Sequence, residues 1–137
     1  MSRLTRFLAP TPVARAHCDI PCGIYDPHEA ETAAKTVSKM VELINGLEGD
    51  DTATRNKFAR CVKVKEEHAE KVKREVQIIW SDYFKPEHLE TYPDLHDKVW
   101  KLLKLAGKNK QNVDAEAAAQ LEAGVAEFSE IFWATKK

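Results

Sequence analysis

The sequence predicts an all-α protein, an antiparallel up-and-down four-helix bundle preceded by a short hook. Three observations support this fold class. With 137 residues, 43% of them hydrophobic, the chain can form one core but not two domains. From residue 26 onward, apolar side chains recur at spacings of three and four, as on one face of a helix. No segment shows the apolar/polar alternation of a half-buried strand.

Composition also narrows the classes of function. The 21 basic and 22 acidic residues give a formal net charge of -1, which argues against a nucleic-acid partner. No stretch approaches the ~20 apolar residues of a membrane span, and the 3 cysteines are too few for a disulfide framework. We therefore expect a soluble, cytoplasmic protein without nucleic-acid or membrane partners.

Residues 1–16 differ from the rest because they contain three arginines and no acidic residue. Pro10 and Pro12 interrupt their apolar run, which is shorter than the ~7–15 residues of a secretory signal. A disordered tail, an organelle-targeting peptide and a propeptide removed on maturation remain open as interpretations. Removal would take the net charge from -1 to -4, because three arginines would be lost.

The hook, residues 17–25, holds two of the cysteines and reads His17-Cys18-Asp19-Ile20-Pro21-Cys22-Gly23-Ile24-Tyr25. Pro21 and Gly23 flank Cys22, so neither helix nor strand is expected. Two thiolates and an imidazole form a soft ligand set for a metal. A Cys18–Cys22 disulfide loop and two unrelated thiols are the alternatives.

Cleavage between Ala16 and His17 would add a further ligand. The free amine of His17, the amide nitrogen and sulfur of Cys18 and the sulfur of Cys22 could then form a planar four-donor set. Nitrogen and sulfur donors in that geometry favour nickel or copper over zinc. In this hypothesis the cleavage of residues 1–16 creates the metal ligand.

The first predicted helix has Asp26 as its N-cap, Pro27 at its first position and Glu29 closing a capping box. Gly46 and Gly49 are expected to end it. Its apolar face consists of Ala30, Ala33, Val37, Met40, Val41, Ile44 and Leu47.

The second predicted helix begins near Asp51 or Thr52 and runs for roughly thirty residues, about 45 Å, until Lys85-Pro86 stops it. We interpret Cys61, on its apolar face, as a small buried hydrophobe. That face consists of Phe58, Cys61, Val62, Ala69, Val72, Val76, Ile79 and Tyr83.

Residues 86–92 are ambiguous, and the third helix is predicted to run from Pro93 to a stop at Gly107. The last helix opens at Asn112 or Asp114. The two apolar faces comprise Leu95, Val99, Leu102, Leu103 and Ala106, and then Ala118, Leu121, Val125, Phe128, Ile131 and Phe132.

The helices contain no Glu three residues before a His, no HExxH, no CxxC and no glycine-rich phosphate loop. We interpret His88 and His96 as surface or interface residues. His68 lies beside the apolar face of the second helix and is interpreted as a satisfied core histidine rather than a functional one.

The hook resembles the nickel hook of the nickel-containing superoxide dismutases. Two further segments are similar to the same family, Trp80-Ser81-Asp82-Tyr83-Phe84-Lys85-Pro86 and the C-terminal residues 131–137. The resemblance covers nearly all of residues 17–137. It implies an enzyme that converts superoxide to dioxygen and hydrogen peroxide by one-electron cycling of one nickel ion per subunit. It also implies a peptidase that removes residues 1–16, a right-handed bundle and a homohexamer.

The resemblance implies roles for individual residues. Nickel is expected to bind the amine and imidazole of His17, the amide nitrogen and thiolate of Cys18 and the thiolate of Cys22. Tyr25 and Tyr83 are expected to flank the open face of the ion as catalytic residues, and Asp19 to support the loop. We consider Lys85 a candidate for steering the superoxide anion, the alternative being a solvated lysine at a helix end.

Two positions depart from the family pattern. Members carry a Glu on the first helix and an Arg on the second that anchor the axial imidazole, and this chain has Ala33 and His68 there. His68 is therefore a hypothetical replacement anchor. Two other functions remain as alternatives: a nickel or copper delivery protein without turnover, and a structural oligomer whose hook is vestigial or closed by a disulfide.

Overall fold

A computed structural model describes residues 22–136, and all the regular structure in this range is helical. The four long helices are α1 (His28–Asn45), α2 (Thr52–Ile78), α4 (Leu95–Gln111) and α5 (Ala115–Thr135). A π-helical turn, η1 (Ile79–Tyr83), and a short helix, α3 (Pro86–Thr91), connect α2 to α4. The predicted all-α class is confirmed.

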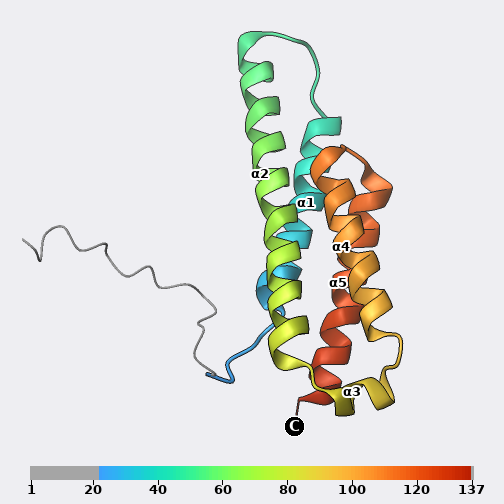
Figure 1. Ribbon diagram of the computed structural model, residues 1–137. Helices are drawn as coiled ribbons and strands as arrows, with labels where there is room; N and C mark the ends of the chain where they lie inside the picture. Colours follow the sequence, from blue (N-terminus) through green and yellow to red (C-terminus); the bar gives the residue numbers. More distant parts are fainter. Residues whose placement is uncertain (1–21, 137) are drawn as a thin grey trace, which may run out of the picture.

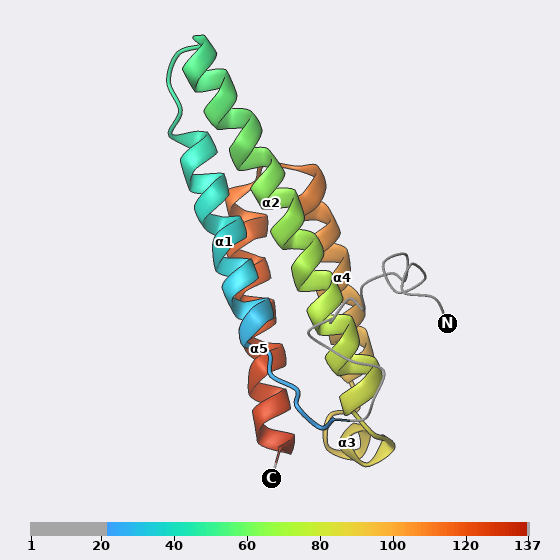
Figure 2. The ribbon, with the colours of Figure 1, turned by 90° about the vertical axis from the view of Figure 1, so that its left-hand side faces the viewer.

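The long helices form an antiparallel bundle in which each packs against two others (Figure 1). α1 and α4 both contact α2 and α5, so the helices surround one central core. The paired ends of α1 and α2 extend beyond α4 and α5, whereas η1 and α3 cover the opposite end (Figures 1 and 2). Among residues 22–136, no helix combines the length and apolarity that a bilayer crossing requires.

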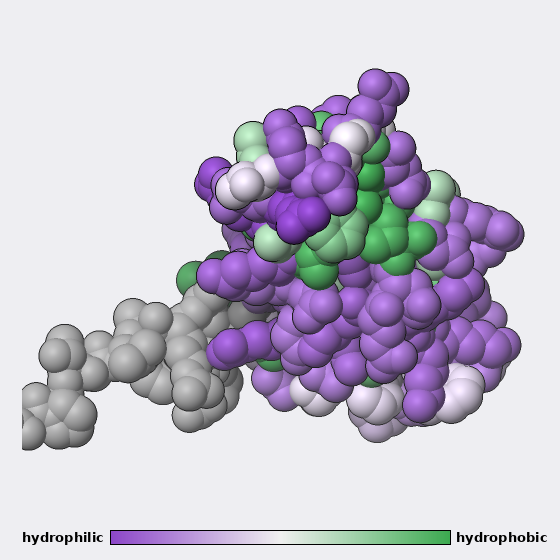
Figure 3. All heavy atoms as spheres, turned by 90° about the horizontal axis from the view of Figure 1, so that it is seen from above, coloured by the Kyte–Doolittle hydropathy of each residue, from purple (hydrophilic) through white to green (hydrophobic). Residues whose placement is uncertain are grey.

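The core changes in composition along the bundle. Three fully buried alanines, Ala30, Ala33 and Ala34, line the first half of α1 and let neighbouring helices approach closely. At the η1 end, Phe128 and Phe132 are buried and partly buried aromatic residues pack around them. Burying each such side chain contributes roughly 1.5–3 kcal/mol. Cys61 is buried, as predicted. Seen from above, the surface is mainly hydrophilic with one apolar area (Figure 3).

Side-chain caps fix the starts of two long helices, α2 and α5. Asp51 accepts a hydrogen bond from the Thr54 amide at 2.8 Å, and hydrogen bonding from the Thr54 side chain, together with that amide, lowers the pKa of the Asp51 carboxyl group. Asp114 caps α5 in the same way, confirming that predicted start. At α1, Asp26 accepts from the His28 amide at 2.8 Å, but the helix begins after Pro27. The predicted capping box with Glu29 is not formed, and Glu29 pairs with Lys71 of α2 instead.

The boundaries of the third long helix differ from those predicted. It begins at Leu95 rather than Pro93, and it continues through Gly107 to Gln111. The reason for the extension is tertiary: the fully buried Lys65 of α2 donates to the backbone carbonyls of Asn109 and Lys110. Carbonyls of a last helical turn need partners from outside the helix. Lys65 supplies these hydrogen-bond partners beyond Gly107, where the sequence predicted the helix to end.

Candidate active site

The described part of the hook comprises Cys22, Gly23, Ile24 and Tyr25. Cys22 is exposed, and the segment runs from the start of α1 across the end of the bundle towards α3 (Figure 2). Gly23 has φ +69°, a conformation that suits glycine and turns the chain next to the thiol. The predicted site residues His17, Cys18 and Asp19, and the whole of residues 1–16, lie outside the described residues.

A cleft of about 770 Å³ opens at this end of the bundle. Three segments far apart in sequence meet there: the hook, η1 with α3, and the last turn of α5. Its lining consists of Gly23, Tyr25, Asp82, Tyr83, Lys85, Glu87, His88, Thr91, Tyr92, Ala134 and Thr135. The fold therefore brings the cysteine-bearing segment to a hollow that is partly lined with tyrosines.

The two tyrosines predicted to act together lie side by side in this cleft. The ring centroids of Tyr25 and Tyr83 are 5.8 Å apart and the rings are tilted by 58°. They come from the hook and from η1, 58 positions apart along the chain. The juxtaposition depends on the π-helical turn, in which the Phe84 amide bonds to the Ile79 carbonyl at 3.4 Å. Such a turn shifts the side chains that follow it around the helix axis.

The Tyr83 ring is enclosed by aromatic side chains. Its centroid lies 4.5 Å from that of Phe132 and 5.1 Å from that of Phe84. The His88 imidazole stacks on it at 5.6 Å and 17°. Contacts on several sides restrict the ring to one orientation.

Two consecutive residues at the end of α5 tie the tyrosines to the bundle. The Tyr83 hydroxyl lies 3.1 Å from Thr135 Oγ1, and the Lys136 ammonium donates to the Tyr25 carbonyl at 2.9 Å. Lys136 Nζ also lies 5.1 Å from the Phe132 ring and 5.3 Å from the Trp133 ring. The C-terminal segment that resembled the family thus forms part of the cleft.

His88 lines the cleft, whereas the sequence pattern led us to interpret it as a surface or interface residue. Its side chain is 15% exposed, and its Nδ1 accepts from the Lys85 amide at 3.1 Å. In a capping box, the side chain at the third helical position accepts a hydrogen bond from the backbone N–H of the N-cap residue, and the His88 ring nitrogen does this in α3. In the sequence, the helix start at Lys85-Pro86 with His88 at the third helical position was the signal that could have indicated this capping role. His96, by contrast, is exposed and accepts from Trp80 Nε1 at 2.8 Å.

Charges of both signs line the cleft. Lys85 is exposed at the start of α3, where the prediction placed a helix end, and Asp82 and Glu87 line the same hollow. Two carboxylates beside one lysine leave no purely positive surface among these lining groups. Any attraction of an anion by Lys85 is therefore local to its ammonium group.

His68 is not brought to the cleft. It lies on α2, fifteen residues before Tyr83, which corresponds to about 22 Å along the helix axis. Its half-buried ring has Nδ1 2.8 Å from the Val64 carbonyl. Because a carbonyl can only accept, Nδ1 is the protonated nitrogen and Nε2 carries the lone pair in the neutral ring. This contact agrees with the interpretation of a satisfied histidine. Ala33 is buried in the core.

Within residues 22–136, no cluster of three or more His, Cys, Asp or Glu side chains could hold a metal ion. Cys22 is the described member of the predicted ligand set. The structure therefore defines a helical-bundle protein in which an exposed cysteine, on a glycine-turned segment, lies beside a cleft partly lined with tyrosines.

Comparison with known proteins identifies the family. A sequence model described as nickel-containing superoxide dismutase matches residues 12–136. The nickel superoxide dismutases of Streptomyces coelicolor and Streptomyces seoulensis are 39% and 37% identical over 134 residues, covering 98% of each chain. A native nickel superoxide dismutase structure superposes with a TM-score of 0.79 and 40% identity, covering 88% of this chain and 100% of the other.

The chain therefore belongs to the nickel-containing superoxide dismutase family. The family membership confirms the predicted class of enzyme and the predicted nickel cofactor, and it does not favour the delivery-protein alternative.

Proposed function

We propose that residues 1–16 are removed and that the mature chain dismutates superoxide at a nickel ion held by the hook. The balanced reaction takes two superoxide ions and two protons to one dioxygen and one hydrogen peroxide. The observation that carries the proposal is the convergence of the Cys22 segment with Tyr25 and Tyr83 in one open cleft.

The chemistry of the donor set fits nickel. The residues that would hold the ion are His17, through its amine and imidazole, Cys18, through its amide nitrogen and thiolate, and Cys22. Thiolate and nitrogen donors of this kind would suit nickel or copper, and Cys22 is exposed next to Gly23, which lines the cleft. When bound, the ion supplies the one-electron redox chemistry that the reaction needs.

The comparisons support processing of the N-terminus. The native structure is covered completely, yet 12% of this chain, about 16 of its 137 residues, lies outside that match. The curated relatives match 98% of the chain. The length left outside the match with the native structure, about 16 residues, equals that of the predicted leader, residues 1–16. We propose that a peptidase cuts between Ala16 and His17 and that Asp19 supports the loop formed afterwards.

The described side chains position the reactants. Tyr25 and Tyr83 provide hydroxyl groups beside the hook, and the enclosure of Tyr83 holds its hydroxyl in a fixed place. Lys85 at the cleft edge would attract the anion, with a strength limited by the neighbouring Asp82 and Glu87. One of the two tyrosines and water in the open cleft would supply the protons that the reaction consumes.

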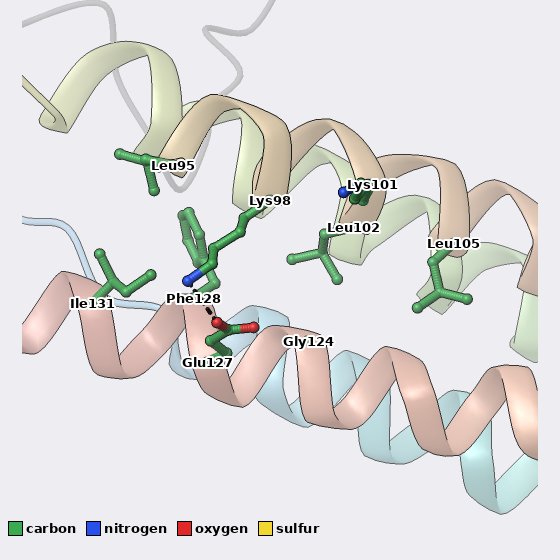
Figure 4. A pocket seen from close by; sticks show the side chains of 9 residues that line it. All are labelled: Leu95, Lys98, Lys101, Leu102, Leu105, Gly124, Glu127, Phe128 and Ile131. Atoms are coloured by element: carbon green, nitrogen blue, oxygen red, sulfur yellow. Dashed lines mark ion pairs between the residues drawn. The ribbon is translucent and has the colours of Figure 1, made fainter. Parts of the chain in front are cut away.

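We further propose a cytoplasmic homohexamer. Exposed apolar residues provide surface that assembly would cover: Ile24 is 75% exposed, Trp100 59% and Trp133 49%. A groove of about 190 Å³ between α4 and α5 has a mainly apolar wall that includes Leu95, Leu102 and Phe128 (Figure 4). An ion pair between Lys98 of α4 and Glu127 of α5, at 2.8 Å, spans this groove.

The decisive experiment compares superoxide consumption by a chain that begins at His17 with that of the uncut chain, both supplied with nickel. Activity only in the trimmed chain supports both the enzyme and the ligand created by cleavage. Tight nickel binding by the trimmed chain, with superoxide decay no faster than with free nickel, would instead favour a delivery protein. A Cys18–Cys22 disulfide without bound metal would favour the structural oligomer.

A further inference from the structure

The hydrogen bonds at the end of α5 fix the direction in which the Tyr83 hydroxyl points its proton. Thr135 Oγ1 lies 2.7 Å from the Phe132 carbonyl oxygen. A carbonyl oxygen only accepts, so the single hydroxyl proton of Thr135 is donated there. The 3.1 Å contact between Thr135 and Tyr83 must then use the proton of Tyr83. Tyr83 is the donor and Thr135 the acceptor.

The ring contacts leave Tyr83 little freedom to choose another partner. Stacking on His88 and the tilted contact with Phe132 hold the ring, so the hydroxyl oxygen stays beside Thr135. His88 is itself held by the Lys85 amide, which bonds to its Nδ1. Tyr83 and Thr135 both line the cleft. With its proton directed to Thr135, the Tyr83 oxygen presents only lone-pair density to the cleft.

We propose that Thr135 is a positioning residue that makes Tyr83 a hydrogen-bond acceptor towards the cleft. This inference rests on the proposed function and deepens it. A phenol oxygen that accepts a hydrogen bond recognises the O–H group of water or hydrogen peroxide. It does not donate to the superoxide anion. Tyr83 therefore orders the protonated species at the site, and capture of the anion depends on other groups.

The first test requires neither nickel nor activity. The full chain is labelled with ¹³C at the tyrosine Cζ atoms, and exchange of the Tyr83 hydroxyl proton is followed in mixed H₂O and D₂O. We expect slow exchange in the unchanged chain and in Thr135→Ser, which keeps the hydroxyl acceptor. Thr135→Val, and Thr135→Ala as a second variant, should exchange at least about fivefold faster, which corresponds to roughly 1 kcal/mol, the net worth of a hydrogen bond. Equal exchange in all four chains would overturn the inference.

The second test uses azide as a small anionic probe in the trimmed, nickel-loaded enzyme. Thr135→Val frees the Tyr83 proton to donate to an anion, so azide should inhibit about tenfold more tightly, as expected for one hydrogen bond to a charged group. Thr135→Ser should keep the original inhibition constant, and Thr135→Val should have no effect in a Tyr83→Phe background. An equal effect in that background would contradict the inference. If no trimmed chain is active, the proposed function fails, whereas the proton-exchange result stands.

Discussion

Lys136 donates a hydrogen bond to the backbone carbonyl of Tyr25 at 2.9 Å, joining two residues that lie 111 positions apart. The contact holds the described end of the hook against the last turn of α5. Because the adjacent residue, Thr135, bonds to Tyr83, one short segment fixes both cleft tyrosines. The end of α5 is thus part of the architecture of the cleft.

Replacing Lys136 with Met keeps the aliphatic stem and removes the ammonium donor. We expect faster amide hydrogen exchange in residues 23–26, because a bond worth about 1 kcal/mol no longer restrains Tyr25. Exchange measured by mass spectrometry on the full chain would show this. The matched control is Lys57→Met, because Lys57 is exposed near the start of α2, away from the η1 end of the bundle. Identical protection in both variants would mean that Lys136 does not restrain the hook.

Sequence patterns predicted the four long helices because each has an apolar face, and Asp51 and Asp114 mark two starts through local capping chemistry. They missed features that depend on distant residues. The extension of α4 beyond Gly107 relies on Lys65, more than forty positions away. The π-helical turn at Ile79–Tyr83 has no compositional mark of its own.

The same contrast holds at the site. The pairing of Tyr25 with Tyr83 was expected from the resemblance to a family, whereas the placement of His88 and Thr135 beside them requires the folded bundle. His88 stacks on Tyr83 only because α3 turns back across the end of the bundle. Local sequence could indicate its capping role at α3 but not the ring that it contacts.

The buried Lys65 should make stability depend on pH. Desolvation lowers the pKa of its ammonium group below the usual 10.5. Between the lowered value and 10.5 the unfolded chain binds more protons than the folded one, so the free energy of unfolding should rise with pH in this window. At pH values below this window Lys65 is charged in the folded chain, so the full free-energy cost of burying its ammonium group is present.

Comparison with Lys65→Met isolates this contribution. The variant should lose about 2 kcal/mol at pH 7, because two carbonyls at the end of α4 lose their donor. Urea unfolding between pH 7 and 10.5 measures both effects. The stability difference between the original chain and the variant should widen as pH rises, and a constant or shrinking difference would contradict the assignment.

Two helical glycines should respond differently to substitution. At Gly107 an added methyl group would meet no atom within 4 Å, so Gly107→Ala should stabilise the protein by about 0.5–1 kcal/mol through helix propensity. At Gly124 the new Cβ would lie 2.9 Å from Leu102 Cδ1, across the groove shown in Figure 4. Strain there should cancel the gain in Gly124→Ala. Thermal unfolding of the two variants compares them directly, and an equal gain at both positions would show that Leu102 yields without cost.

The hypothesis that His68 anchors the His17 imidazole leads to the last prediction. With Nδ1 donating to Val64, the neutral ring offers only Nε2 as an acceptor for an imidazole N–H. If it serves that role, His68→Ala should alter both the reduction potential and the activity of the trimmed, nickel-loaded protein. His28 is an exposed histidine at the start of α1, so the control variant His28→Ala should alter neither the reduction potential nor the activity. Stability of the metal-free chain, measured in parallel, separates a loss of packing at position 68 from a loss of the anchor. A potential and an activity that both stay unchanged in His68→Ala would remove His68 from the site and leave it as the satisfied histidine that its contact with Val64 describes.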